Sequence, residues 1–154
     1  MVYHSILTLH ILSFTVFIGA TVIDFILFRH FWKLYEPEST RTKALWDAKK
    51  KVGPFIRFGG TFAFLAGLGM MAFMYRVYGE QTWMQIKIPL VIIAVIIAVI
   101  IARGQEKNIE SGIQSNVAFS GEQQARLKSK YVTLYTVQFC LFFLIVMLSS
   151  FRFD

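Results

Sequence analysis

Few side chains in this 154-residue chain could do chemistry, because 56% of the residues are hydrophobic and 16% are charged. His10 and Lys87 both lie inside long apolar runs, where an ionisable group is costly in lipid and marks a candidate functional site. A neutral imidazole could ligate haem iron, bind copper or hydrogen-bond a neighbouring helix. The Lys87 ammonium could pair with an anionic substrate or a haem propionate, or reach the interface as a snorkelling lysine.

Other polar or soft side chains extend this list. Arg76 follows the second apolar run and could bind anionic groups together with Lys87, while Met74 could supply a soft second ligand or only pack. Asp24 and Arg57 have similar expected depths on adjacent helices at the opposite side of the membrane. A structural ion pair is the natural interpretation, with a proton relay as the alternative.

The elements that must position these residues are four apolar runs, each close to the roughly 20 residues that cross a bilayer core as a helix. We expect an all-α, integral membrane four-helix bundle that forms a single domain over residues 1–154. The predicted helices span residues 5–30, 54–77, 83–103 and 131–151, and the predicted long loops span residues 31–53 and 104–130.

Small residues on the second run allow two interpretations. Gly59, Ala63 and Gly67 recur at four-residue spacing, which is typical of close helix packing and would also leave a flat face for a planar macrocycle. Gln138, midway along the fourth run, is expected to hydrogen-bond a neighbouring helix. Pro54, at the beginning of the second run, suits a helix start.

The net charge of +7 lies mostly in the two predicted loops, as expected for charge beside a membrane, and no nucleic-acid-binding motif accompanies it. The positive-inside rule then predicts cytoplasmic loops and both termini on the outer side, in a prokaryotic-type plasma membrane. The first loop is expected to contact anionic lipid. A single cysteine excludes an intrachain disulfide, and motifs for hydrolases, nucleotide binding or covalent haem attachment are absent.

Two short segments resemble a known family. Leu9-His10-Ile11, in an aromatic-rich helix that ends in Phe28-Arg29-His30-Phe31, resembles the first helix of HemJ-type protoporphyrinogen oxidases and of related small membrane proteins of the copper-resistance protein D group. Trp83-Met84-Gln85-Ile86-Lys87-Ile88-Pro89-Leu90-Val91 resembles the start of their third helix. The resemblance implies a b-type haem ligated by His10, a Lys87 required for activity, and oxidation of protoporphyrinogen IX to protoporphyrin IX.

The sequence therefore predicts a haem b-binding or porphyrin-handling membrane redox protein, with His10 as axial ligand and with Lys87, joined by Arg76, as anchors for anionic groups. Its partners would be the lipid bilayer and a quinone, a redox partner or a second copy, but not nucleic acid. Two other classes stay open. One is a non-enzymatic accessory or assembly subunit, and the other is a copper-handling protein that uses His10 and the methionines.

Overall fold

Four long helices dominate the structure, a computed structural model that describes residues 2–36, 39–78, 81–114 and 119–151. They are α1 (Val2–Lys33), α2 (Thr40–Tyr78), α3 (Thr82–Gln105) and α5 (Gly121–Phe151). A π-helical turn, η1 (Glu106–Glu110), and a short helix, α4 (Ser111–Gln114), follow α3. All four long helices are long and apolar enough to cross a membrane, which confirms the predicted all-helical fold.

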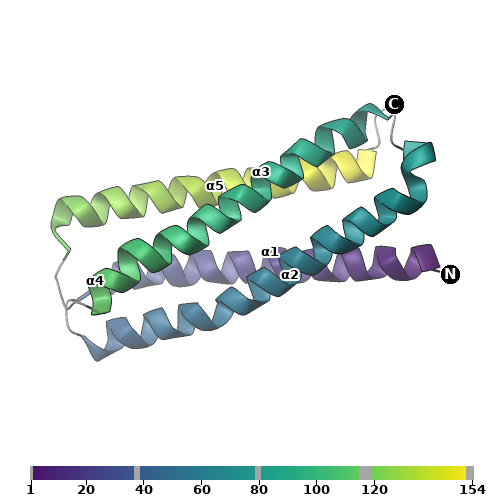
Figure 1. The fold of residues 1–154 in the computed structure, drawn as a ribbon. Coiled ribbons are helices and arrows are strands. Elements are labelled where there is room, and N and C mark those ends of the chain that lie inside the picture. The colour runs from purple at the N-terminus through teal and green to yellow at the C-terminus, as the bar shows by residue number, and fades with distance from the viewer. Residues whose placement is uncertain (1, 37–38, 79–80, 115–118, 152–154) are drawn as a thin grey trace.

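The helices run alternately in opposite directions, so that α1 begins and α5 ends at the same end of the bundle (Figure 1). We call this the terminal end, and the end at which α1 stops and α2 begins the loop end. Contacts are most extensive between α1 and α2, followed by α3 and α5. A smaller contact between α1 and α5 joins these two pairs, whereas α2 and α3 touch little.

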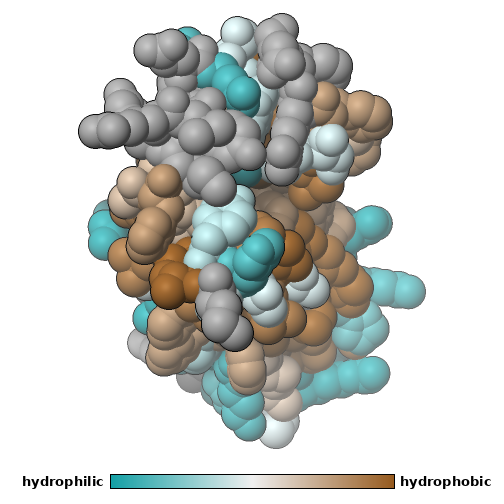
Figure 2. Space-filling model, turned by 90° about the vertical axis from the view of Figure 1, so that its right-hand side faces the viewer, coloured by the Kyte–Doolittle hydropathy of each residue, from teal (hydrophilic) through white to brown (hydrophobic). Residues whose placement is uncertain are grey.

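Large apolar side chains cover the outside of the bundle. Examples are Phe55, Phe58 and Phe73 on α2, whose exposed fractions are 62%, 65% and 63%. Figure 2, viewed from the terminal end, shows brown apolar side chains over much of the surface that the grey atoms leave visible. Exposing so continuous an apolar surface to water is unfavourable, whereas lipid solvates it well.

The helices extend well beyond the predicted apolar spans. The expected loop over residues 31–53 is mostly helical, since α1 continues to Lys33 and α2 already begins at Thr40. The early part of α2 is helical because it packs against the rest of the bundle, where Trp46 and Lys49 are buried. Pro54 consequently lies inside α2, and its predicted place at the helix start was wrong.

Two aromatic-rich clusters form the core. The cluster at the loop end contains eight buried residues: Phe28, Phe31, Trp32, Trp46, Ile101, Ile109, Tyr131 and Tyr135. The second cluster lies further toward the terminal end and contains Phe17, Ala94, Leu141, Phe142 and Ile145, with Phe14 packed against it. Gln138 precedes Leu141 on α5 by one turn and thus lies between the clusters along that helix.

Helix α1 approaches α2 closely at Gly59. A Cβ atom on Gly59 would lie 2.8 Å from the Phe17 backbone nitrogen and 3.0 Å from the Ser13 carbonyl oxygen. Backbone atoms cannot rotate away as a side chain can, so any larger residue must push the helices apart. The close-packing interpretation of the small residues is therefore confirmed at this position.

We expect Gly59→Ala to destabilise the protein by about 1–3 kcal/mol because the added methyl group overpacks this contact. Gly19→Ala in α1 is the matched control, since a Cβ atom there meets nothing within 4 Å and alanine stabilises a helix interior by roughly 0.5–1 kcal/mol over glycine. Thermal unfolding in mild detergent, followed by circular dichroism, measures both variants. Equal melting temperatures for the two variants would contradict this account of the α1–α2 contact.

Candidate functional site

His10 is held against α2 by a specific hydrogen bond. Its Nδ1 atom lies 2.7 Å from the Ala63 carbonyl oxygen, and a carbonyl oxygen can only accept, so Nδ1 carries the proton. In a neutral ring, the lone pair then lies on Nε2. Metal-bound histidines are commonly oriented in this way, with the other ring nitrogen donating to a backbone carbonyl.

Gly67 leaves the space that the imidazole fills. A Cβ atom on Gly67 would lie 3.2 Å from Cε1 of His10, so even alanine would press against the ring. The Phe14 ring lies parallel to the imidazole one turn further along α1, with 6.4 Å between the ring centroids. The glycine, the carbonyl group and the phenyl ring together restrict the imidazole to a single orientation.

Lys87 of α3 belongs to the same part of the bundle, as predicted from the expected depths. It lies in the second turn of α3, which begins at the terminal end, and His10 lies in the same half of the bundle. Its Nζ atom lies 5.9 Å from the ring centroid of Trp83, which is buried one turn earlier on α3. The side chains of Met74 and Arg76, which were predicted to join this site, lie outside the described part of the chain.

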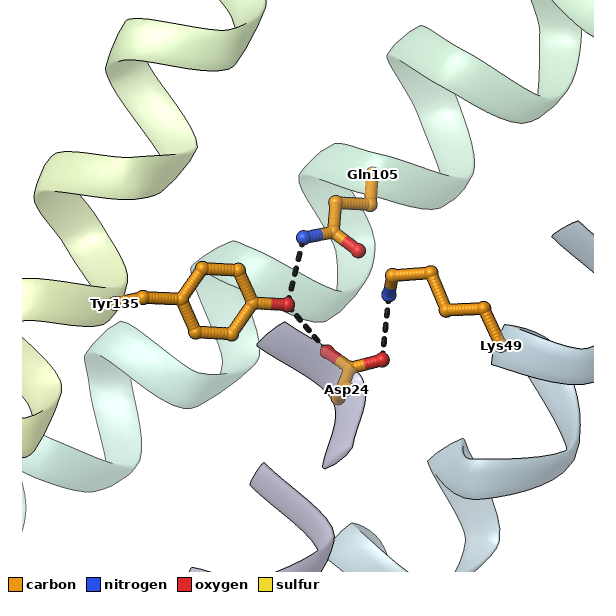
Figure 3. A network of polar contacts seen from close by, with 4 residues as sticks. All are labelled: Asp24, Lys49, Gln105 and Tyr135. Carbon is orange, nitrogen blue, oxygen red and sulfur yellow. Dashed lines mark hydrogen bonds and ion pairs between the residues drawn. The ribbon is translucent and has the colours of Figure 1, made fainter. Parts of the chain in front are cut away.

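A second polar cluster, the Asp24 cluster, joins all four long helices near the loop end (Figure 3). The Asp24 carboxylate on α1 accepts a hydrogen bond from Lys49 Nζ of α2 at 2.6 Å and another from the Tyr135 hydroxyl of α5. Gln105, the last residue of α3, donates from Nε2 to the Tyr135 oxygen at 2.9 Å. All four residues are buried, so the charges of Asp24 and Lys49 compensate each other in a poorly solvated environment.

The predicted ion pair between Asp24 and Arg57 was wrong. Arg57 is exposed and takes part in no ion pair within the described ranges, and Lys49 is the partner of Asp24. The antiparallel register of α1 and α2 explains why Asp24 pairs with Lys49 and not with Arg57. Fourteen residues separate His10 from Asp24 on α1, and fourteen separate Lys49 from Ala63 on α2, so the two contacts use one register. Arg57 lies eight residues, or about 12 Å of helix, beyond Lys49.

Sequence reasoning missed Lys49, Tyr135 and Gln105 as members of this cluster. A signal for Lys49 exists in the sequence, because Thr42, Trp46 and Lys49 recur at helical spacing and all three are buried on one face of α2. Tyr135 and Gln105 carry no comparable signal. Each is recognised only once the α3–α5 pair is placed against α1.

Several buried polar atoms near the Asp24 cluster have no hydrogen-bond partner among the described residues. They are Nε1 of Trp32 and of Trp46, Oε1 of Gln105, and both amide atoms of Gln138. The prediction that Gln138 hydrogen-bonds a neighbouring helix is therefore wrong, although its exposed fraction is 0%. Unpartnered atoms of this kind are rare in folded proteins and require an explanation.

Comparison of the chain with protein-family models, with curated proteins and with solved structures returns no match. Within the described ranges, no three histidine, cysteine, aspartate or glutamate side chains gather in a way that could hold a metal ion. The two polar sites described above, one on each half of the bundle, are therefore the features from which a function can be inferred.

We expect Asp24→Ala to destabilise the protein by about 3–5 kcal/mol, because it leaves the buried Lys49 ammonium without its counter-charge. The matched control is Lys50→Ala, which removes an ion pair to Glu110 from a lysine whose side chain is 48% exposed, and which should cost below about 1 kcal/mol. Thermal unfolding in detergent measures both. A loss for Asp24→Ala no larger than that of the control would contradict a stabilising role for the pair.

Proposed function

We propose that this protein is a haem b-binding, porphyrin-handling redox protein of a membrane, with His10 as the axial ligand. The hydrogen bond from His10 Nδ1 to the Ala63 carbonyl group carries the proposal. It fixes the tautomer in which Nε2 keeps its lone pair and can coordinate iron.

The residues around His10 fit such a cofactor in two further respects. Gly67 keeps side-chain bulk away from the imidazole ring, and Phe14 supports that ring from the direction of the core. Lys87 supplies a cation in the same half of the bundle, which suits the propionate groups that every protoporphyrin carries. A bound haem would supply one-electron chemistry, whereas the protein provides ligation, orientation and a counter-charge.

The same proposal covers protoporphyrinogen IX as the substrate. Lys87 and Arg76 would bind its carboxylates, and Lys87 would be required for activity. Oxidation to protoporphyrin IX removes hydrogen from the macrocycle, and the electrons would leave through a membrane quinone or a partner chain. An amphipathic, planar substrate of this kind partitions into lipid, which suits a site built on membrane helices.

We further propose that the loop end faces the cytoplasm of a prokaryotic cell and that both termini lie outside. Basic side chains support this orientation, because many of them are exposed on the helices around the loop end: Lys33, Arg41, Lys43, Lys51, Arg126, Lys128 and Lys130. Basic residues next to membrane helices favour the cytoplasmic side and attract anionic lipid headgroups.

His10→Ala should abolish stoichiometric haem, because His4, the other histidine described in this half of the bundle, is exposed and lies six residues away on another face of α1. The measurement is a reduced-minus-oxidised absorption spectrum with pyridine haemochrome quantification, on protein from a host supplied with haem precursor. His30→Ala is the matched control, since His30 is exposed at the loop end. The proposal fails if the wild-type protein binds no stoichiometric haem, or if both variants retain it equally.

Lys87→Met should weaken binding of protoporphyrin IX by about 10- to 100-fold, which corresponds to the loss of one charge-assisted hydrogen bond. Lys51→Met removes the same charge from an exposed position at the loop end and should leave the affinity unchanged. Quenching of tryptophan fluorescence during porphyrin titration measures both affinities. An equal effect of the two substitutions would mean that only net charge matters and that Lys87 is no specific anchor.

A further inference from the structure

The Asp24 cluster contains a continuous chain of protonatable groups. Lys49 Nζ contacts one carboxylate oxygen of Asp24 at 2.6 Å, and the Tyr135 hydroxyl contacts the other. The chain crosses from α2 through α1 to α5 without an intervening apolar group. In a membrane protein, buried ionisable residues in contact with one another are typical of proton pathways as well as of structural pairs.

Hydrogen-bond accounting leaves a buried acceptor beside these groups that no described residue satisfies. Tyr135 gives its single hydroxyl proton to Asp24, so its oxygen accepts from the amide nitrogen of Gln105. This orientation leaves the Gln105 Oε1 atom without a donor, although Gln105 is only 2% exposed. Figure 3 shows that oxygen turned toward the Asp24–Lys49 pair. Water is the small donor that satisfies a buried acceptor in such a polar environment.

Gln138 supplies an independent observation on the same helix as Tyr135. It lies three residues further toward the terminal end, is fully buried, and leaves both amide atoms without a protein partner. A fully buried amide that neither donates nor accepts is expensive, and a bound water molecule can compensate for both atoms. Polar groups therefore continue past Tyr135 into the middle of the bundle.

At the loop end, the hydrogen-bonded series from Lys49 to Tyr135 lies next to solvent-exposed groups. Lys50, adjacent to Lys49, is exposed and pairs with Glu110, the last residue of the π-helical turn η1. That turn begins directly after Gln105, and its Asn108 donates a hydrogen bond to the hydroxyl of Tyr131. Single π-helical turns within α-helices often occur at functional sites.

We propose that Lys49, Asp24 and Tyr135, with water bound at Gln105 and Gln138, form a proton-transfer site that exchanges protons with the aqueous phase at the loop end. The inference does not rest on the haem proposal, because the transfer requires no cofactor. Lys49 and Asp24 carry the proton, whereas Gln105 and Tyr135 are positioning residues that hold the carboxylate in place.

The elementary step conserves charge within the buried cluster. The Lys49 ammonium gives a proton to the Asp24 carboxylate, so that one N–H bond breaks and one O–H bond forms, leaving a neutral amine and a carboxylic acid. A water molecule from the loop end then gives one proton to the amine while the Asp24 acid returns one proton to that water, so the ion pair is restored, the water is regenerated and the cluster gains no net charge. The first step creates no net charge in the low-dielectric interior, so it avoids the large cost of a single buried ion.

The surroundings of Asp24 favour a half-pathway over a complete channel. The groups that face it are Lys49 from α2, Tyr135 from α5 and, through Tyr135, Gln105 from α3. Toward the terminal end, the rings of Phe14, Phe17 and Phe142 pack edge to face and contain no protonatable group. The chain therefore exchanges protons with one side of the membrane only.

Infrared difference spectroscopy through pH steps tests the proposal on the full chain in liposomes, without haem. We expect a carboxylic acid C=O band from the neutral amine–acid form of the Asp24–Lys49 pair, whereas a pair that stays strictly ionic would show none. Asp24→Asn should remove the band. If that variant does not accumulate, Asp24→Asn combined with Lys49→Met removes both charges together and serves the same assignment.

Deuterium exchange of the same band tests the role of Lys49. Lys49→Met should retain the acid band. It should slow the exchange of the Asp24 acid proton for deuterium at least about tenfold, because the Lys49 amine delivers the proton. Lys50→Met, one residue away and exposed, should change neither band nor rate. The absence of an Asp24 acid band from the wild-type protein, or an exchange rate that Lys49→Met leaves unchanged, would overturn the proposal.

Discussion

The rest of the bundle depends on the interactions of the Asp24 carboxylate. It takes hydrogen bonds from α2 and α5 and reaches α3 through Gln105, so one side chain of α1 links all four long helices. A charge at this depth is expensive unless it is paired, which makes the relative placement of the helices a condition for its stability. Apolar contacts between lipid-facing helices lack such directionality, since lipid solvates those surfaces equally well.

The two polar sites divide the bundle into halves with different properties. In the terminal half, His10 is oriented by the Ala63 carbonyl group and Gly67, and Lys87 lies in the same half. In the loop half, charges of opposite sign compensate each other and water can approach. Between them lies the aromatic cluster around Phe142. Under the two proposals, this separation would keep the redox site apart from the site at which protons are exchanged.

The sequence predicted the helices well because a bilayer leaves few choices of structure, and a run of about 20 apolar residues is sufficient evidence for one. His10 and Lys87 were found for the same reason, as rare ionisable groups in apolar runs. The partner of Asp24 could not be found in this way. Both Lys49 and Arg57 lie near the start of the second apolar run, and only the register of α1 against α2 distinguishes them.

The sparse contact between α2 and α3 has a consequence for biogenesis. The molecule consists of two helical hairpins, and the first of them, α1 with α2, already contains the Asp24–Lys49 pair and the His10 hydrogen bond. During synthesis this hairpin can leave the translocation machinery with its charges matched, before α3 and α5 exist. Tyr135 and Gln105 reach Asp24 only when the second hairpin docks. Completion of this hydrogen-bond chain is thus a late step of assembly, and it distinguishes a correctly docked bundle from two hairpins that merely share a membrane.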